Sequence, residues 1–108
     1  MTVEPRIACR TPAEGRDGVT NIPQWKFDLL RAAIEQVLAD GPVPFSALKD
    51  AVRPLIAADD LARLGSLGWH VTVVKLELEV RGVIMRLAEP GPQKIALAGG
   101  MSGARSDG

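Results

Sequence analysis

The stretch that decides the fold is Gly65–Gly82, GSLGWHVTVVKLELEVRG. It contains one of the two tryptophans, the only histidine, and the densest run of β-branched and leucine residues in the chain. The segments before it have the hydrophobic periodicity of helices, and those after it alternate like the strands of a hairpin. The conformation of this stretch therefore determines how its neighbours pack.

Residues 69–81 fit two conformations. Every second residue from 74 to 80 is apolar and the residues between them are charged, as in a half-buried strand. Wound as a helix, the same segment carries two apolar stripes. Gly82 favours the helix because glycine commonly follows a helix C-terminus, and segment 65–68 resembles a turn between two helices. We predict a helix over residues 69–81.

The predicted helix must cover both of its apolar stripes. The first stripe consists of Trp69, Val73, Leu76 and Val80. The second consists of Val71, Val74 and Leu78. One stripe can pack on a helix that precedes it in the chain. The other then needs the hairpin, the N-terminal segment or a second subunit.

Three helical segments are predicted upstream. The first spans residues 24–40, with apolar side chains at helical spacing: Phe27, Leu30, Ile34, Val37 and Leu38. Gly41 and Pro42 end it. Residues 43–45 form an extended connector that needs a partner strand. A second helix follows until Pro54 interrupts it, and a third spans residues 57–64.

Two strands are predicted downstream, over residues 83–88 and 94–98, with a turn rich in proline and glycine between them. Helix, short strand, helix, helix and hairpin is the order of a winged helix, whose hairpin is the wing. We therefore predict an α+β fold of the winged helix-turn-helix type over residues 24–98, with three to four helices and a C-terminal β-hairpin wing. Residues 99–108, small and glycine-rich, are predicted to be a flexible tail.

Residues 1–23 are predicted to be a loosely packed, partly extended arm. Proline and glycine recur too often in this segment for a helix of useful length. Ile7 and Cys9 alternate with polar neighbours, which allows a short strand. The arginines of the arm are balanced by acidic residues, which weighs against an arm that wraps DNA.

Three segments resemble a family of small, functionally uncharacterised bacterial proteins. They are TNIPQWKFDLLRAAI (20–34), ADDLARLGSLGWHVTVVKLELEVRG (58–82) and PGPQKI (90–95). The resemblance extends from about Ile7 to Leu97 and implies a fold similar to winged-helix domains. It implies no activity, because the family has none assigned.

The composition excludes several classes of protein. The chain has 108 residues, enough for one domain, and 13 basic residues balance 13 acidic ones. A net charge of zero excludes a strong non-specific nucleic-acid binder. One cysteine makes no intramolecular disulfide, so we expect a reduced, cytoplasmic protein. No apolar run approaches the ~20 residues of a membrane span, and the first residues lack the apolar core of a signal peptide.

No catalytic or metal-binding constellation is predicted. Cys9 and His70 lie far apart in sequence, and an active pair would need a third, orienting group. They also supply too few ligands for zinc. Asp59 and Asp60 lie where a helix begins, and the helix dipole accounts for acids at that position. We expect no enzyme, no metal, no cofactor and no small-molecule ligand.

Nucleic-acid binding, as in a transcriptional regulator, is the first functional hypothesis, and it depends on analogy of fold. The residues expected to contact DNA lie on the helix over 69–81 and on the wing: His70, Thr72, Lys75, Arg86 and Lys94. Residues 25–89 carry eight basic and nine acidic side chains, so a monomer is expected to bind weakly.

Association with another protein, or with a second copy of the chain, is the second hypothesis. The expected interface is the stripe formed by Val71, Val74 and Leu78. The arm or the hairpin covers this stripe within one chain in the alternative arrangement. Periodicity does not decide between the two, because it does not say what covers a face.

Overall fold

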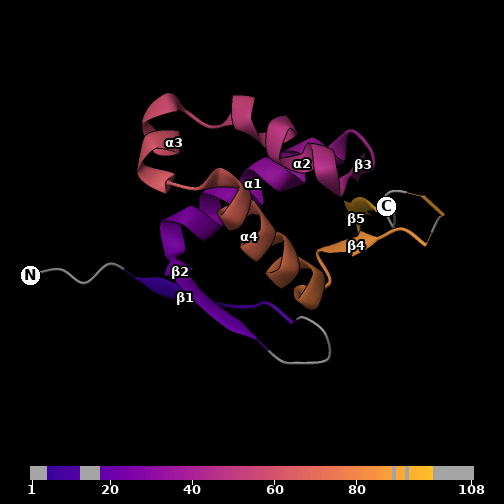
Figure 1. The fold of residues 1–108 in the computed structure, drawn as a ribbon, viewed down its shortest axis with the longest axis horizontal. Helices are drawn as coiled ribbons and strands as arrows, with labels where there is room; N and C mark the ends of the chain where they lie inside the picture. The colour runs from indigo at the N-terminus through magenta and orange to yellow at the C-terminus, as the bar shows by residue number, and fades with distance from the viewer. Residues whose placement is uncertain (1–4, 13–17, 89, 92, 99–108) are drawn as a thin grey trace, which may run out of the picture.

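The computed structural model describes residues 5–12, 18–88, 90–91 and 93–98. These residues form an α+β fold with four α-helices, one short 3-10 helix and two small antiparallel sheets (Figure 1). In chain order the elements are β1 (Arg6–Arg10), β2 (Val19–Pro23), α1 (Gln24–Ala39), β3 (Val43–Pro44), α2 (Phe45–Val52), η1 (Arg53–Leu55), α3 (Ala58–Leu64), α4 (Leu67–Arg81), β4 (Ile84–Arg86) and β5 (Lys94–Leu97).

Helix α4 lies at the centre of the fold and confirms the helix predicted over residues 69–81. It begins after Ser66, whose side-chain oxygen accepts a hydrogen bond from the Trp69 backbone N–H at 3.2 Å. It ends at Gly82, which has a φ of +78°. This left-handed conformation is readily available only to glycine, so the end of the helix is encoded locally.

We expect Gly82→Ala to lower the free energy of unfolding by about 1 kcal/mol, because a Cβ is strained at positive φ. Gly68→Ala is the matched control. Gly68 lies in the first turn of α4, and an added Cβ there would meet only the Cδ of the flexible Lys49 side chain, at 3.4 Å. That change should raise the free energy of unfolding by about 0.5 kcal/mol. Urea titrations followed by circular dichroism measure the free energy of unfolding of both variants. If both substitutions changed it in the same direction, the left-handed conformation of Gly82 would not be what ends α4.

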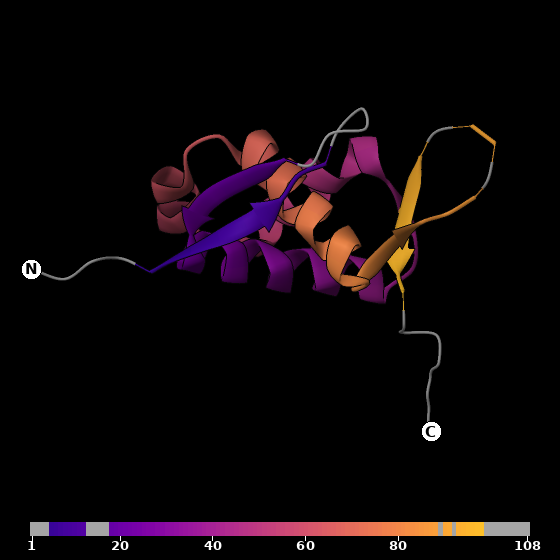
Figure 2. The ribbon, with the colours of Figure 1, turned by 90° about the horizontal axis from the view of Figure 1, so that it is seen from below.

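The upstream helices follow the predicted periodicity. Helix α1 buries its apolar side on α4, and Figure 2 shows the two helices lying one above the other. The buried residues of α1 are Phe27, Leu30, Ala33, Ile34 and Leu38. Pro54 falls in η1, the tighter turn that ends α2. No helix in the described part of the chain is long and apolar enough to cross a bilayer.

The N-terminal segment is the main departure from the predicted fold. The short strand allowed around Ile7 and Cys9 is present as β1, but it is not part of a loose arm, because β1 and β2 form an antiparallel ladder from Arg6↔Pro23 to Arg10↔Val19. The ladder packs against α1 and α4, and it buries Cys9 and Ile22 in the same core as the helices. Residues 1–4 and 13–17 lie outside the described part. The predicted domain of residues 24–98 therefore shares its core with the segment before it.

The second sheet contains the predicted hairpin. Strands β4 and β5 pair antiparallel, with Ile84↔Leu97 and Arg86↔Ile95 opposite each other. β3 pairs with the other side of β5, so the extended connector finds its partner strand there. The strand order is β3-β5-β4. The predicted tail over 99–108 lies outside the described residues.

Candidate functional site

The five residues predicted to contact DNA do not form one surface. His70 is buried at the start of α4, and its Nδ1 lies 2.7 Å from the Ser66 carbonyl oxygen. Thr72 is exposed, and its hydroxyl donates to the Gly68 carbonyl oxygen at 3.0 Å. The N-terminal half of α4 therefore presents only one of its three predicted contacts, Thr72, to solvent.

Lys75, the third predicted contact on α4, lies inside the fold with 3% of its surface exposed. Its ammonium is 3.0 Å from a Glu79 carboxylate oxygen, donates to Gln93 Oε1 at 3.2 Å and lies 4.6 Å from the centre of the Phe45 ring. Burial lowers the pKa of Lys75, while the hydrogen bond to Glu79 opposes this effect. Lys75 is thus a buried ion-pair partner and does not present its charge to a phosphate.

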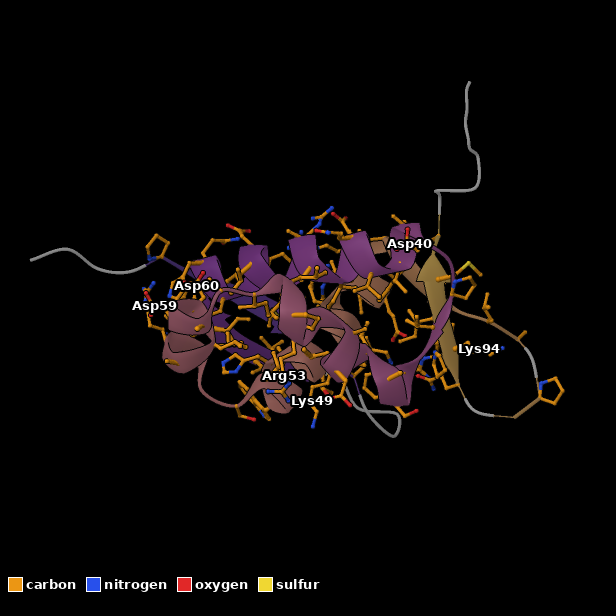
Figure 3. The ribbon with its side chains drawn as sticks, turned by 90° about the horizontal axis from the view of Figure 1, so that it is seen from above. Asp40, Lys49, Arg53, Asp59, Asp60 and Lys94 are labelled. Atoms are coloured by element: carbon orange, nitrogen blue, oxygen red, sulfur yellow. The ribbon has the colours of Figure 1, made fainter. Side chains whose placement is uncertain are left out.

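The two predicted contacts on the β4–β5 hairpin are exposed. Arg86 donates to both carboxylate oxygens of Glu79, from Nε at 3.0 Å and from its terminal nitrogen at 3.3 Å. Lys94 begins β5 and is labelled in Figure 3. The structure therefore brings Arg86 and Lys75 together on one carboxylate, Glu79, rather than along a common outer face.

The predicted interface stripe lies in the core. Val71, Val74 and Leu78 have exposed fractions of 1%, 0% and 0%, and they belong to the cluster that includes Phe27 of α1. The alternative arrangement, coverage within one chain, is the one in this structure. An interface on α4 therefore needs other residues.

The opposite side of α4 supplies such residues. Trp69 and Val80 are 50% and 42% exposed, and Leu76 between them is half-buried. Because they are seven and four residues apart, all three lie on one side of the helix. We call these three residues the outward row. They belong to the first stripe of the sequence analysis, whose fourth member, Val73, is buried. The apolar pattern of the sequence therefore includes the residues of the outward row. It does not indicate which of the two stripes stays uncovered.

A pocket of about 420 Å³ adjoins the C-terminal end of the outward row. Its lining residues are Arg10, Pro12, Gly18, Val19 and Val80. Val19, on β2, is the most exposed large apolar residue of the described chain, at 62%. The apolar surface of α4 thus continues onto the β1–β2 ladder.

A buried carboxylate, Glu77, fixes that ladder to α4. It accepts hydrogen bonds from the Arg10 backbone N–H at 2.6 Å and from the Arg10 guanidinium at 3.0 and 2.8 Å. Arg81 donates to it as well, at 2.7 Å. The Arg10 guanidinium and backbone N–H, with Arg81, hold the pKa of Glu77 at about 2 although burial opposes this. The sequence gives no local sign of this contact, because Arg10 and Glu77 are 67 residues apart.

The residues considered for catalysis and metal binding all lie in the part of the chain that the structure describes. No group of three histidine, cysteine or acidic side chains there could hold a metal ion. Cys9 is completely buried, and burial raises the pKa of its thiol to about 11. A thiol in that state is a poor nucleophile, because the thiolate is the reactive form. Asp59 and Asp60 lie in the first turn of the short helix α3, as the dipole favours.

A family of unknown function (DUF6958) matches residues 6–95. The chain belongs to this family. No curated protein and no solved structure matches the chain. The DUF6958 match begins with the first residue of β1 and ends within β5, so the β1–β2 ladder is part of the family domain.

Proposed function

We propose that this DUF6958 domain is a non-enzymatic module for protein–protein interaction, and that the outward row of α4 is its docking surface. The observation that carries the proposal is that Trp69 and Val80 are about half exposed on the central helix of the fold. Tryptophan is strongly enriched among the residues that dominate binding energy at interfaces. Contiguous exposed apolar side chains on a single chain commonly mark an interaction site.

We further propose that the domain is a winged-helix variant. The order α1, β3, α2, α4, β4 and β5 supports this topology, with α3 as an additional helix and β1–β2 as an N-terminal addition. In such a comparison α4 takes the position of the helix that reads DNA. Here Trp69 and Val80 are exposed on that helix, which favours a protein partner over a phosphate backbone.

Nucleic-acid binding is the second candidate, and exposed cations outside α4 favour it. Lys49 and Arg53 lie one helical turn apart on α2 and η1, and Figure 3 shows them close together. Arg86 and Lys94 are exposed on the wing. Against this candidate, Lys75 is buried and the chain has no net positive charge, so little affinity would come from phosphate neutralisation.

A photo-crosslinking experiment, in cells that express the protein naturally, distinguishes protein–protein interaction from nucleic-acid binding. A photoreactive phenylalanine analogue replaces Trp69, and a matched control carries it at Gln36, which is exposed on α1. We expect a discrete protease-sensitive adduct from position 69 that is absent from position 36 and is lost when Val80→Asp is added. A nuclease-sensitive adduct would support nucleic-acid binding instead. Equal labelling from both positions would contradict a docking surface on α4.

A further inference from the structure

The charges beside the outward row are unevenly exposed. Two carboxylates, Glu77 and Glu79, lie on α4 with side-chain exposures of 2% and 15%. Their partners Arg10 and Arg86, on the two sheets, are each 54% exposed. The acidic member of each pair therefore lies inside while the basic member faces solvent. Of these four side chains, the two guanidinium groups are the more accessible to a binding partner of α4.

Each carboxylate also serves two cations. Glu77 binds Arg10 and Arg81, and Glu79 binds Lys75 and Arg86. Two positive charges against one negative charge leave each group with a net charge of +1 among the described residues. The local charge beside α4 is thus positive although the whole chain is neutral.

A further exposed cation, Lys49 on α2, lies at the other end of the row. The stem of Lys49 approaches Gly68 in the first turn of α4, and no ion pair of Lys49 is present in the described part of the chain. The row from Trp69 to Val80 is about 16 Å long, as eleven residues of helix require. Basic groups from α2, β1 and β4 accordingly lie at the two ends of an apolar row of this length.

We propose that the outward row binds an amphipathic helix of another protein, one whose apolar stripe is bordered by aspartate or glutamate. This inference rests on the proposed function and names the chemistry of its partner. A helix of about three turns matches the length of the row, and helices pack along one another through such rows of side chains. Acidic borders would meet Arg10, Lys49 and Arg86, and complementary charge favours both encounter and register.

The same observations disfavour the other occupants. A second copy of the chain would bring its own Arg10 and Arg86 to the interface, so that like charges would face each other. DNA would place phosphates over Trp69, Leu76 and Val80, which cannot neutralise them. An acidic amphipathic helix satisfies both the apolar centre and the basic border.

Two labelled peptides test the inference by fluorescence anisotropy with the full chain. Both have leucine at i, i+3, i+4 and i+7; one carries glutamate and the other lysine at its remaining positions. We expect the acidic peptide to bind at least about tenfold more tightly, with a difference that shrinks at high salt. Trp69→Ser should weaken the acidic peptide about tenfold, and Lys49→Glu about threefold. Asp59→Lys on α3 is the control variant, and it should change the affinity for neither peptide.

Other results would overturn the inference. Equal affinity for the two peptides would remove the charge complementarity, and absence of binding would remove the helical partner. A dimer in sedimentation that Trp69→Ser dissociates would make a second copy the occupant. Salt-sensitive binding of a 30-base-pair duplex that displaces the acidic peptide would make DNA the occupant. If the photoreactive residue at position 69 crosslinks to a protein in cells while neither peptide binds, the proposal of an acidic helix as the partner is wrong but the proposed function stands. If position 69 crosslinks to nothing, the proposed function itself is wrong.

Discussion

Val74→Asp should abolish cooperative folding. Val74 is completely buried on the side of α4 that belongs to the core of the fold. An aspartate at this position would bury either a carboxylate or a protonated carboxyl group without a cation to pair with it. Such a group costs several kcal/mol, which is comparable to the ~5–15 kcal/mol that stabilise a typical domain. We expect the thermal transition seen by circular dichroism to disappear.

Two further variants keep this prediction open to contradiction. Val74→Ala removes only methyl groups and should leave a folded protein that is about 1–3 kcal/mol less stable. Thr72→Asp, two residues earlier and exposed, should change the free energy of unfolding by about 0.5 kcal/mol or less. A folded Val74→Asp protein with an altered oligomeric state would place Val74 at an interface between chains, as one sequence-based hypothesis had it.

The sequence predicted those parts of the fold that local signals encode. The extent of α1 follows from its apolar spacing and from Gly41–Pro42 behind it, and the end of α4 follows from Gly82. The two strands of the hairpin, β4 and β5, follow from the turn between them. In each case the decisive residues lie within a few positions of the element they define, so periodicity and turn chemistry suffice.

The sequence allowed a short strand around Ile7 and Cys9, which is β1, but it did not predict the pairing of that strand with β2. β1 and β2 are joined through a segment rich in proline and glycine, and the periodicity of each strand covers only five residues. Their stability comes from packing on α1 and α4 and from the contact between Arg10 and Glu77, which connects distant parts of the chain. Interactions at that separation leave no local pattern.

The candidate site depended on how this ladder packs, which the sequence did not predict. Two stripes of similar apolar character run along α4, and the sequence does not say which of them the rest of the chain covers. Burial of the stripe around Val74 also draws in the charged neighbours Lys75 and Glu77, which periodicity alone would place toward solvent. The same arrangement left Trp69 and Val80 uncovered, so the site prediction selected the stripe that became core.

Glu77→Gln should show the energetic weight of the ladder attachment, and its effect should depend on pH. The pKa of Glu77 is about 2 in the folded protein against an ordinary value of 4.5, so the unfolded chain binds a proton more readily between these values. Stability from this carboxylate is therefore fully present above about pH 5 and is lost as the pH falls toward 2. The difference in pKa corresponds to about 3 kcal/mol.

We expect Glu77→Gln to lower the free energy of unfolding by about 3 kcal/mol at pH 7, measured by urea titration. The gap between the wild type and the variant should narrow below pH 5 and close near pH 2. Glu35→Gln is the matched control, because Glu35 forms an ion pair with Arg31 on a helix but is 39% exposed. That variant should cost about 0.5 kcal/mol or less. If Glu77→Gln matched Glu35→Gln at pH 7, or if its gap persisted at pH 2, the ladder would be held by packing alone and not by the buried carboxylate.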